Sequence, residues 1–505
     1  MLRPFDIGFR PFLAVLAIAT LLVGAHDAAA TVINVTTTAD EFNTDGDCSL
    51  REALDAANIN AVRDACPAGS NAGQDEIVLA ADGFYSLTRP FTNATANDGA
   101  LTIRNDTPTS DLKISVAGTG TATISQDAVP DTRVIGVATG AHLDLEDVTI
   151  TGGALTGASV RGAGILNGTN ARLALLRCTI ASNTSDDSGA GIRNEGALIV
   201  EDSAFTRNIA GQSGGAISSS SNTTVLITGS FFADNESRGQ FGGGGAIESS
   251  DQISVVDSSF VNNRARTVGG AISHFDDVAN QSSISQSCFV GNIAGFSGNA
   301  IDVFDGSKDL GAAGLWWGAV NGPSGTGPGD GDGVGLRVKF DPANPEPLAA
   351  CLPMELVANG GFQSDRDTNG VPDRWTAVNF GTADGRACSG DACLVKMRGN
   401  GLVKRLSHEI QYAGNAGESL TFRARSRAKD VPAGGGPYRA FITIFHVDGS
   451  KQSITLNFTA GKHGFERLKQ DVTVTENYTG IAVAVEYGRS GGIVRFDSVS
   501  VLLNP

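Results

Sequence analysis

The chain has 505 residues, of which 54 are acidic and 37 basic, so its formal net charge is −17. A chain of this length can form about two or three domains with a large buried core. The acidic excess argues against nucleic acid and anionic membranes as partners, because both bind basic surfaces. With 65 glycines and only 3 methionines, the composition is typical of tight turns and short strands rather than long helices.

Residues 1–30 have the three parts of a secretory signal peptide. Arg3 and Arg10 precede an apolar run at 13–24, and three alanines end the segment. The run is shorter than the ~20 residues that span a bilayer, and an uncleaved anchor is the alternative. We therefore expect a secreted or cell-surface protein that begins near Thr31, has no membrane span after cleavage, and can form disulfides.

Residues 31–76 are expected to form a cap around one short helix. Ser49 and Glu52 have the spacing of a capping box, which starts a helix. Apolar residues then recur at helical spacing: Leu50, Ala53, Leu54, Ala57 and Ala61. Such a helix can cover the open end of the strands that follow. Cys48 and Cys66 flank it and could form a disulfide, whereas a catalytic Cys48 would lack a nearby histidine as base.

The middle of the chain, from about residue 140 to 305, repeats with a period of 25 to 30 residues. One element ends in an isoleucine after a glycine-containing turn: Ile165, Ile192, Ile217, Ile247, Ile272 and Ile301. A second element places an apolar residue three positions before an asparagine: Ile180/Asn183, Phe205/Asn208, Phe232/Asn235, Phe260/Asn263 and Phe289/Asn292. Apolar and polar residues alternate over short runs between these elements, which indicates strands.

A repeat of this length fits one turn of a parallel β-helix, and it is too short for a four-stranded propeller blade. Stacked turns place equivalent side chains ~4.8 Å apart, so isoleucine lies on isoleucine and the asparagine amides can hydrogen-bond along the stack. Weaker copies extend the pattern towards residue 77. The sequence therefore predicts an all-β fold, with a right-handed parallel β-helix over 77–352 behind the N-terminal helical cap.

The residue after each repeated isoleucine should face outward and form one column: Leu166, Arg193, Ser218, Glu248, Ser273 and Asp302. Glu248 and Asp302 would lie two turns, or ~10 Å, apart, just beyond the usual separation of an inverting carboxylate pair. If the protein is an enzyme, the candidate catalytic residues are Glu248, Asp302, Arg193 and the adjacent His274. The column lacks clustered acids with an arginine base, so we favour a non-catalytic surface.

The repeats end near Trp316 and Trp317. We expect both rings to pack against the last turn, with a sugar-stacking platform as the alternative. Cys288, in the last strong repeat, is the candidate disulfide partner of Cys351. This pairing leaves Cys178 unpaired and buried.

From residue 353 to 505 the repeat stops, and longer alternating strands predict a β-sandwich or jelly roll of about eight or nine strands. Cys388 and Cys393 are expected to form a local disulfide. Four aromatic residues could stack on sugar rings: Trp375, Tyr412, Tyr438 and Tyr487.

One segment of this domain has the spacing of a calcium loop. Oxygen ligands stand at positions 1, 3, 5 and 9, and a backbone carbonyl at position 7: Asp365, Asp367, Asn369, Asp373 and Val371. Gly370 occupies the sharp bend at position 6. Thr376 replaces the bidentate glutamate of position 12, so we expect weak calcium binding, with a solvated acidic turn as the alternative.

Several segments resemble known families. The glycine–alanine–isoleucine and Phe-x-x-Asn repeats resemble those of polymorphic outer-membrane proteins, within the pectin lyase-like class of right-handed parallel β-helices. Residues 48–53 resemble the CSLREA-type N-terminal domain found ahead of secreted β-helix repeats. Residues 356–376 and 494–501 resemble jelly-roll carbohydrate-binding modules of the family 4/9 type. These resemblances imply surface exposure, adhesion and carbohydrate binding.

We therefore predict a secreted or cell-surface protein of extracellular recognition or adhesion, which binds a glycan or another surface ligand without catalysis. A polysaccharide lyase or glycoside hydrolase of the pectin lyase-like class is the first alternative, and a structural surface-layer element is the second. Calcium, in the C-terminal domain, is the expected cofactor.

Overall fold

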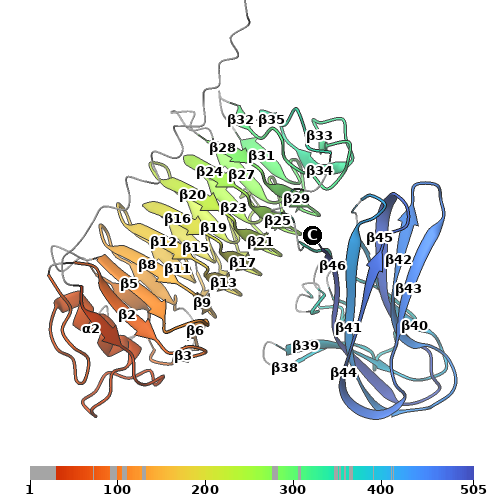
Figure 1. The fold of residues 1–505 in the computed structure, drawn as a ribbon, viewed down its shortest axis with the longest axis horizontal. Coiled ribbons are helices and arrows are strands. Elements are labelled where there is room, and N and C mark those ends of the chain that lie inside the picture. The colour runs from red at the N-terminus through yellow and green to blue at the C-terminus, as the bar shows by residue number, and fades with distance from the viewer. Residues whose placement is uncertain are drawn as a thin grey trace, which may run out of the picture.

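The computed structural model describes residues 30–504 with internal gaps, which are 72, 91–98, 105–110, 128–131, 158, 241, 276–281, 305–308, 346–347, 349–350, 352–353, 358–359, 363–364, 366–367, 373, 390–391, 411 and 413. The predicted signal peptide thus lies outside the described residues, apart from Ala30. The described chain forms one helix, α2 (Leu50–Ile59), a parallel β-solenoid and an antiparallel β-sandwich (Figure 1). This arrangement confirms the predicted all-β fold class.

Four parallel sheets build the described part of the solenoid. The first has 11 strands: β1 (Val32–Asn34), β2 (Asp75–Leu79), β5 (Asp111–Val116), β8 (His142–Glu146), β12 (Arg172–Leu176), β16 (Ala197–Glu201), β20 (Thr224–Thr228), β24 (Gln252–Val256), β28 (Ser283–Ser285), β32 (Leu310–Gly311) and β35 (Val338–Lys339). The second has 10 strands: β4 (Leu101–Ile103), β7 (Ile135–Val137), β11 (Ile165–Asn167), β15 (Ile192–Asn194), β19 (Ile217–Ser219), β23 (Ile247–Ser249), β27 (Ile272–Phe275), β31 (Ile301–Phe304), β34 (Gly331–Val334) and β33 (Pro323–Gly325).

The third sheet has 8 strands: β3 (Phe84–Leu87), β6 (Ala122–Gln126), β9 (Val148–Thr151), β13 (Thr179–Ala181), β17 (Ala204–Thr206), β21 (Phe231–Ala233), β25 (Ser259–Val261) and β29 (Cys288–Val290). The fourth has 6 two-residue strands: β10 (Ala154–Leu155), β14 (Thr184–Ser185), β18 (Ile209–Ala210), β22 (Glu236–Ser237), β26 (Arg264–Ala265) and β30 (Ile293–Ala294). About seven turns, from β4–β6 to β27–β29, place a strand in each of the three longer sheets.

The repeated apolar residues stack along the solenoid interior, as the repeat predicts. Ile165 pairs in register with Ile192, and Ile192 with Ile217. Phenylalanine rings on successive turns stack with centroids 4.7 to 4.9 Å apart: Phe205, Phe232, Phe260 and Phe289. The Trp317 ring covers the end of this stack, with its centroid 5.3 Å from that of Phe289, and it is fully buried. This confirms the packing role predicted for Trp317.

The asparagines form a buried ladder along the same turns. The Nδ2 of each donates to the Oδ1 of the next at 2.9 to 3.0 Å: Asn183, Asn208, Asn235, Asn263 and Asn292. Backbone N–H groups donate to the same Oδ1 atoms, so each bend is held by two hydrogen bonds from the preceding turn. Because the ladder is buried, water does not reach the polar atoms of these amides. The neighbouring amides supply their hydrogen bonds instead.

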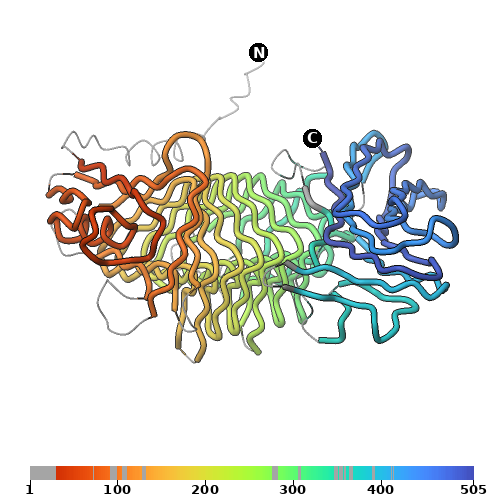
Figure 2. Tube along the Cα trace, turned by 90° about the horizontal axis from the view of Figure 1, so that it is seen from below, coloured from red at the N-terminus to blue at the C-terminus, as the bar shows by residue number. Residues whose placement is uncertain are grey.

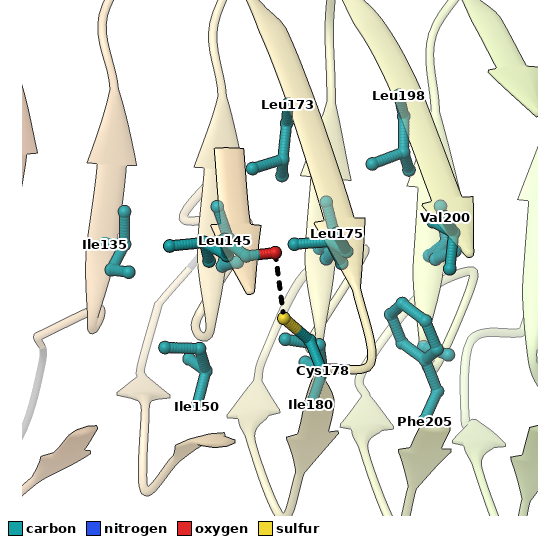
Figure 3. Close-up of a cluster of buried hydrophobic side chains, with 14 of the residues drawn as sticks. Ile135, Leu145, Ile150, Leu173, Leu175, Cys178, Ile180, Leu198, Val200 and Phe205 are labelled. Atoms are coloured by element: carbon teal, nitrogen blue, oxygen red, sulfur yellow. Dashed lines mark hydrogen bonds between the residues drawn. The ribbon is translucent and has the colours of Figure 1, made fainter. Parts of the chain in front are cut away.

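A serine column lies two residues before the stacked rings, and the sequence analysis did not identify it. The backbone N–H of each turn donates to the hydroxyl of the next: Ser203, Ser230, Ser258 and Ser287. Cys178 occupies the first position, where its N–H donates to Ser203 Oγ at 2.9 Å and its thiol lies 3.3 Å from the carbonyl of Leu145 (Figure 3). Cys178 is therefore the free, buried cysteine predicted, and it takes a serine's place.

The predicted cap closes the N-terminal end of the solenoid. The Ser49 hydroxyl accepts from the Glu52 N–H, and the Glu52 carboxylate accepts from the Ser49 N–H, which completes the capping box. Arg51 is buried, pairs with Asp40 and donates to the Gly99 carbonyl at 2.7 Å. The polar residues of this motif thus hold the cap on the first turns.

The C-terminal sandwich consists of two antiparallel sheets in the described residues. One contains β36 (Met354–Glu355), β38 (Gly385–Ser389), β39 (Ala392–Arg398), β46 (Ile493–Leu503), β41 (Ser419–Val431) and β44 (Gly461–Thr473). The other has the order β37 (Thr376–Val378), β40 (Lys404–Ile410), β45 (Tyr478–Tyr487), β42 (Tyr438–His446) and β43 (Lys451–Asn457). Figure 2 shows the sandwich at the end of the solenoid opposite the cap.

The sandwich packs on the solenoid through a shared apolar cluster. Trp316 is fully buried and meets Tyr412 edge-on, with ring centroids 6.4 Å apart. Arg374 donates to the carbonyl of Asn262 at 2.7 Å. The Cys288–Cys351 disulfide ties the last full turn to the segment that leads into the sandwich. The other two predicted disulfides, Cys48–Cys66 and Cys388–Cys393, are also present.

Candidate functional site

The predicted outward column exists, but it is not open to solvent. Arg193 pairs in register with Ser218, and Ser218 with Glu248, two turns before Asp302. Glu248 and Asp302 are only 9% and 5% exposed. One glycine packs against the last carboxylate of the column, because a Cβ on Gly335 would come within 2.0 Å of Asp302 Oδ1.

Neighbouring side chains already engage the buried column. Glu248 accepts from the hydroxyls of Ser218 at 2.7 Å and Ser250 at 3.0 Å. Asp302 accepts from Ser297 at 2.7 Å, and burial raises the pKa of its carboxyl. These polar contacts hold both carboxylates in place, and little of either side chain is exposed to solvent.

His274, the catalytic candidate predicted beside the column, does not face it. Successive strand residues point to opposite faces, so His274 shares the inward face of Ile272 while Ser273 lies in the column. His274 is 3% exposed and pairs in register with Val303, a member of the solenoid core. Arg193, Glu248, His274 and Asp302 therefore do not form one site.

The four aromatic residues predicted to stack on sugars are all core residues. Trp375, Tyr412, Tyr438 and Tyr487 are 6%, 0%, 2% and 0% exposed. Trp375 packs against Phe362, and the Tyr438 hydroxyl lies 2.8 Å from Ser426 Oγ. Because all four rings are buried, the stacking prediction is wrong for these positions.

Two other rings do point outward from the sandwich. Phe441 and Phe445 lie on β42 on the face opposite the core residues Ile442 and Ile444. The guanidinium groups of Arg405 and Arg439 lie over Phe441, 5.6 and 5.1 Å from its ring centroid. The Lys451 ammonium lies 5.2 Å from the Phe445 centroid. We call this outer surface of the five-stranded sheet the Phe441 face.

The central strand of the Phe441 face has small side chains. Gly480, Ala482 and Ala484 alternate on β45 with core-facing residues, and Ala484 lies directly between Ser407 and Phe441. The small side chains of β45 thus lie between Ser407 on one side and Phe441 on the other.

One buried carboxylate organises the charges of the Phe441 face. Glu486 is 1% exposed, and its oxygens accept from Arg405 at 2.6 Å and Arg439 at 2.8 Å. The two guanidinium groups are thereby held in fixed orientations with their remaining N–H groups free to reach a ligand. A sequence signal was present, since Phe441 and Phe445 share the strand parity of Arg439 and Thr443 rather than that of the core.

The predicted calcium loop lies only partly within the described residues. Asp367 and Asp373 are outside them. Asp365 Oδ2 accepts from the Gly370 N–H at 3.1 Å, and Asn369 Oδ1 accepts from the Val371 N–H at 2.7 Å. Gly370 has φ +80°, as the bend of such a loop requires. The described part therefore forms a tight turn with a glycine at its bend, and calcium binding there stays a prediction.

A second acidic group lies in the cap, just before α2. Oxygens of Glu41, Asp45 and Asp47 lie within 4.8 Å of one another, as do those of Asp47, Glu52 and Asp64. Burial and then the neighbouring carboxylates raise the pKa of Glu41 and Asp47. The sequence signal for this group is the run of acidic residues just before Cys48, which was not among the predicted sites.

Spacing gives the cap group a resemblance to a calcium loop. Oxygen side chains stand at positions 1, 3, 5 and 12 of one segment: Glu41, Asn43, Asp45 and Glu52. Gly46, with φ +96°, stands at position 6. Both Glu52 oxygens already accept backbone N–H groups, from Asn43 at 2.8 Å and Ser49 at 3.0 Å, so this carboxylate serves the capping box.

A third group lies where two loops of the sandwich meet. His446, Asp448 and Glu476 place one possible ligand atom each within 4.8 Å of the others. His446 Nδ1 also lies 2.7 Å from Ser450 Oγ. These residues could hold a divalent cation beside the end of β42 and the start of β45.

Comparisons with known proteins give structural similarities without assigning a family. No family model matches the chain, and no curated protein matches it. The CSLREA resemblance therefore stays a prediction. No helix in the described part of the chain is long and apolar enough to cross a membrane.

Among solved structures, the C-terminal part is similar to two carbohydrate-binding modules. TmCBM61, solved with β-1,4-galactotriose, is 15% identical over 30% of this chain and 99% of the module, with a TM-score of 0.22. A family 4 module is 15% identical over 26% of this chain and 96% of the module, with a TM-score of 0.21.

A longer similarity joins this chain to tailspike protein 4 of bacteriophage CBA120. The enzymatically active domain of the tailspike is 12% identical over 85% of this chain and 60% of that chain, with a TM-score of 0.23. At these identities and scores, none of the three similarities assigns a function to this chain.

Proposed function

We propose that this protein recognises a glycan outside the cell without catalysis, through the Phe441 face of its sandwich. The observation that carries the proposal is the pair of outward rings, Phe441 and Phe445, beside a strand of glycine and alanine. Aromatic rings can cover the apolar face of a sugar, and oriented guanidinium groups can donate to its hydroxyls. Because Glu486 fixes Arg405 and Arg439, these donors need little ordering on binding.

The buried column supports the non-catalytic part of the proposal. A general acid or base must come within about 3 Å of the reacting group. Glu248 and Asp302 are buried and accept hydrogen bonds from serines, and His274 points into the core. A polysaccharide lyase or glycoside hydrolase would have to use other residues.

An extracellular location is part of the same proposal. Three disulfides join described cysteines, and such bonds persist mainly in oxidising compartments. The expected signal peptide at residues 1–30 provides the route of export.

Calcium binding at residues 365–373 is proposed as an accessory feature. Thr376, just after the loop, starts β37, and β37 pairs with β40 at the edge of the sheet that carries the Phe441 face. A cation in the loop would tether this edge strand and so steady the binding surface.

Glycan binding is tested with the mature chain and neutral oligosaccharides of cellulose, xylan and galactan, by calorimetry. We expect at least one series to bind, and the double variant Phe441→Ala/Phe445→Ala to lose about tenfold or more in affinity. Phe465→Ala is the matched control, because Phe465 also lies under two arginines, Arg425 and Arg427, but on the outer face of the other sheet.

Two outcomes would overturn the proposal. If the double variant binds as well as the unmodified chain while Phe465→Ala does not, the recognition surface lies on the other sheet. If incubation with pectin, alginate or cellulose steadily releases unsaturated or reducing-end sugars, the protein is an enzyme, and the non-catalytic assignment is wrong.

A further inference from the structure

A groove crosses the fourth sheet of the solenoid, far in sequence from the Phe441 face. It has a volume of about 500 Å³ and extends over three consecutive turns, at β22, β26 and β30. Its walls are Glu236, Arg238, Arg264, Ala265, Arg266, Ile293 and Gly295. The strands here are only two residues long, so the outward side chains come from both the strand and the bend that follows it.

The groove is positive although the chain is strongly acidic. Three arginines face one glutamate, a local balance of 3 − 1 = +2 in a chain of net charge −17. Glu236 pairs with Arg238 at 3.2 Å. Arg264 and Arg266 are exposed, and their guanidinium groups have no hydrogen bond or ion pair to any residue that the structure describes. Two cations are therefore available to an external anion.

The arginines are arranged by the repeat itself. Arg264 pairs in register with Glu236 on the preceding turn and with Ile293 on the next. Two residues further along, the Arg238 N–H donates to the Ala210 carbonyl and the Arg266 N–H to the Ser237 carbonyl, so these two residues hold equivalent places on adjacent turns. Stacked turns are separated by ~4.8 Å, so the backbones of Arg238 and Arg266 lie at about that interval along the solenoid axis.

On the following turn, the position equivalent to Arg238 and Arg266 is Gly295, and this glycine keeps one end of the groove open. A Cβ on Gly295 would come within 2.1 Å of the Arg266 carbonyl oxygen, so no side chain fits there. Beside it, Ile293 is 42% exposed. Phe296 is 81% exposed, which is more than any other large apolar residue of the described chain. Anion-binding groups thus adjoin an apolar surface.

We propose that this groove binds an acidic polysaccharide, a glycan chain whose carboxylates or sulfates meet the arginines while its rings lie against Ile293 and Phe296. Guanidinium groups bind carboxylate and sulfate oxygens through paired N–H donors. Regularly spaced arginines favour a polymer with anionic groups at intervals over a single small anion. A nucleic acid fits less well, because its dense charge would be repelled by the acidic remainder of the molecule.

The test compares two anionic probes, oligogalacturonate for carboxylates and dextran sulfate for sulfates, with neutral dextran. Binding to the full mature chain is measured at low and high salt. We expect at least one anionic probe to bind, with an affinity that falls as salt rises. Replacing the three arginines, as Arg238→Gln/Arg264→Gln/Arg266→Gln, should weaken binding about tenfold or more.

A matched control separates this site from general charge effects. Arg398→Gln/Arg423→Gln/Arg467→Gln removes the same charge from exposed positions of the sandwich and should leave the affinity unchanged. The Phe441→Ala/Phe445→Ala variant should also bind the anionic probes normally, so failure of this inference and failure of the proposed function are distinguishable. The inference is overturned if neither anionic probe binds, if both arginine triples lose affinity equally, or if an oligonucleotide of equal charge binds as tightly.

Discussion

Asp332 accepts the hydrogen bonds that a sixth asparagine of the ladder would accept from Asn292. Its Oδ2 receives the Asn292 N–H at 2.8 Å and Nδ2 at 2.7 Å, and its Oδ1 receives the Gly291 N–H at 3.0 Å. The geometry repeats that of the amide rungs, but the group is ionisable. Burial raises the pKa of the Asp332 carboxyl to about 7, although the N–H donors and Arg374 act in the opposite direction. The end of the ladder thus has a titratable group that the other rungs lack.

Replacing Asp332 by Asn should therefore change how stability depends on pH. The native pKa of about 7 is above the unfolded value of about 3.9, so native Asp332 retains a proton between these values that the unfolded chain has lost. The contribution of Asp332 to stability consequently falls as pH rises from about 4 to 7 and stays constant above that. Asp332→Asn has no such decline, so its advantage in thermal midpoint should grow over the same interval.

Calorimetric unfolding of the two proteins from pH 4 to 8 measures this difference. The free energy of unfolding of Asp332→Asn should exceed that of the unmodified chain by at most a few kcal/mol at pH 8, and the difference should be near zero at pH 4. Asp330→Asn is the control, because Asp330 is exposed and its pairing with Asn321 lies outside the ladder. Parallel pH profiles for Asp332→Asn and the unmodified chain would show that the carboxylate is fully ionised in the native ladder.

Substitution of an asparagine in the interior of the ladder should destabilise the protein much more than substitution of Asp332 at its end. Asn235→Ala removes the acceptor of two groups on Asn208 and the donor to the Phe205 carbonyl, and it leaves buried polar atoms without partners. Each such loss costs about 1–3 kcal/mol, so we expect a loss of several kcal/mol in the free energy of unfolding. Denaturant titration measures it. Asn457→Ala, at an exposed position of β43, should be nearly neutral, and an equally small effect at Asn235 would contradict the stabilising role of the ladder.

Cys178 should behave as an inert core residue. Burial raises the pKa of its thiol to about 12, so the native protein should not react with iodoacetamide at pH 8, whereas the unfolded protein should take up one equivalent. Cys178→Ser should preserve stability to within about 1 kcal/mol, since the serines of the same column donate to the carbonyl two residues back. Cys178→Ala lacks this donor and should be the less stable variant. Rapid labelling of the native protein would contradict the assignment.

The solenoid could be predicted from the sequence because its information is local and repeated. Ile192 recurs on each turn, Phe205 recurs with an asparagine three positions later, and stacking of equal turns is the arrangement that buries all copies alike. The Cys48–Cys66 and Cys388–Cys393 disulfides and the capping box of α2 join residues that are close in the sequence, so they could be predicted in the same way.

The candidate sites could not be predicted equally well, because exposure depends on contacts between distant segments. Glu248 stands at an outward strand position, yet it is buried and accepts hydrogen bonds from Ser218 and Ser250. Tyr412 is buried because the sandwich meets Trp316 of the solenoid. The parity of Phe441 was readable from β42, but a strand with apolar residues at both parities does not reveal which face the other sheet covers.

Calcium should stabilise the protein through the loop at residues 365–373. Asp365→Asn removes one charged ligand of this loop, and its amide can still accept from the Gly370 N–H, so the turn itself should persist. We expect the unmodified chain to bind calcium weakly, since Thr376 stands where a bidentate glutamate would, and its thermal midpoint to rise on addition of calcium. Asp365→Asn should reduce both effects.

The matched comparison is Asp45→Asn in the cap, where a second acidic group gathers around Glu41 and Asp47. Calcium titration of both variants by calorimetry locates any binding. If Asp365→Asn lowers the number of sites and Asp45→Asn does not, the sandwich loop binds the cation. If only Asp45→Asn lowers it, the prediction for residues 365–373 is wrong and the cation belongs to the cap, where it would act on α2 and the first turns rather than on the edge strand β37. A midpoint insensitive to chelation in all three proteins would contradict a stabilising role for calcium at either place.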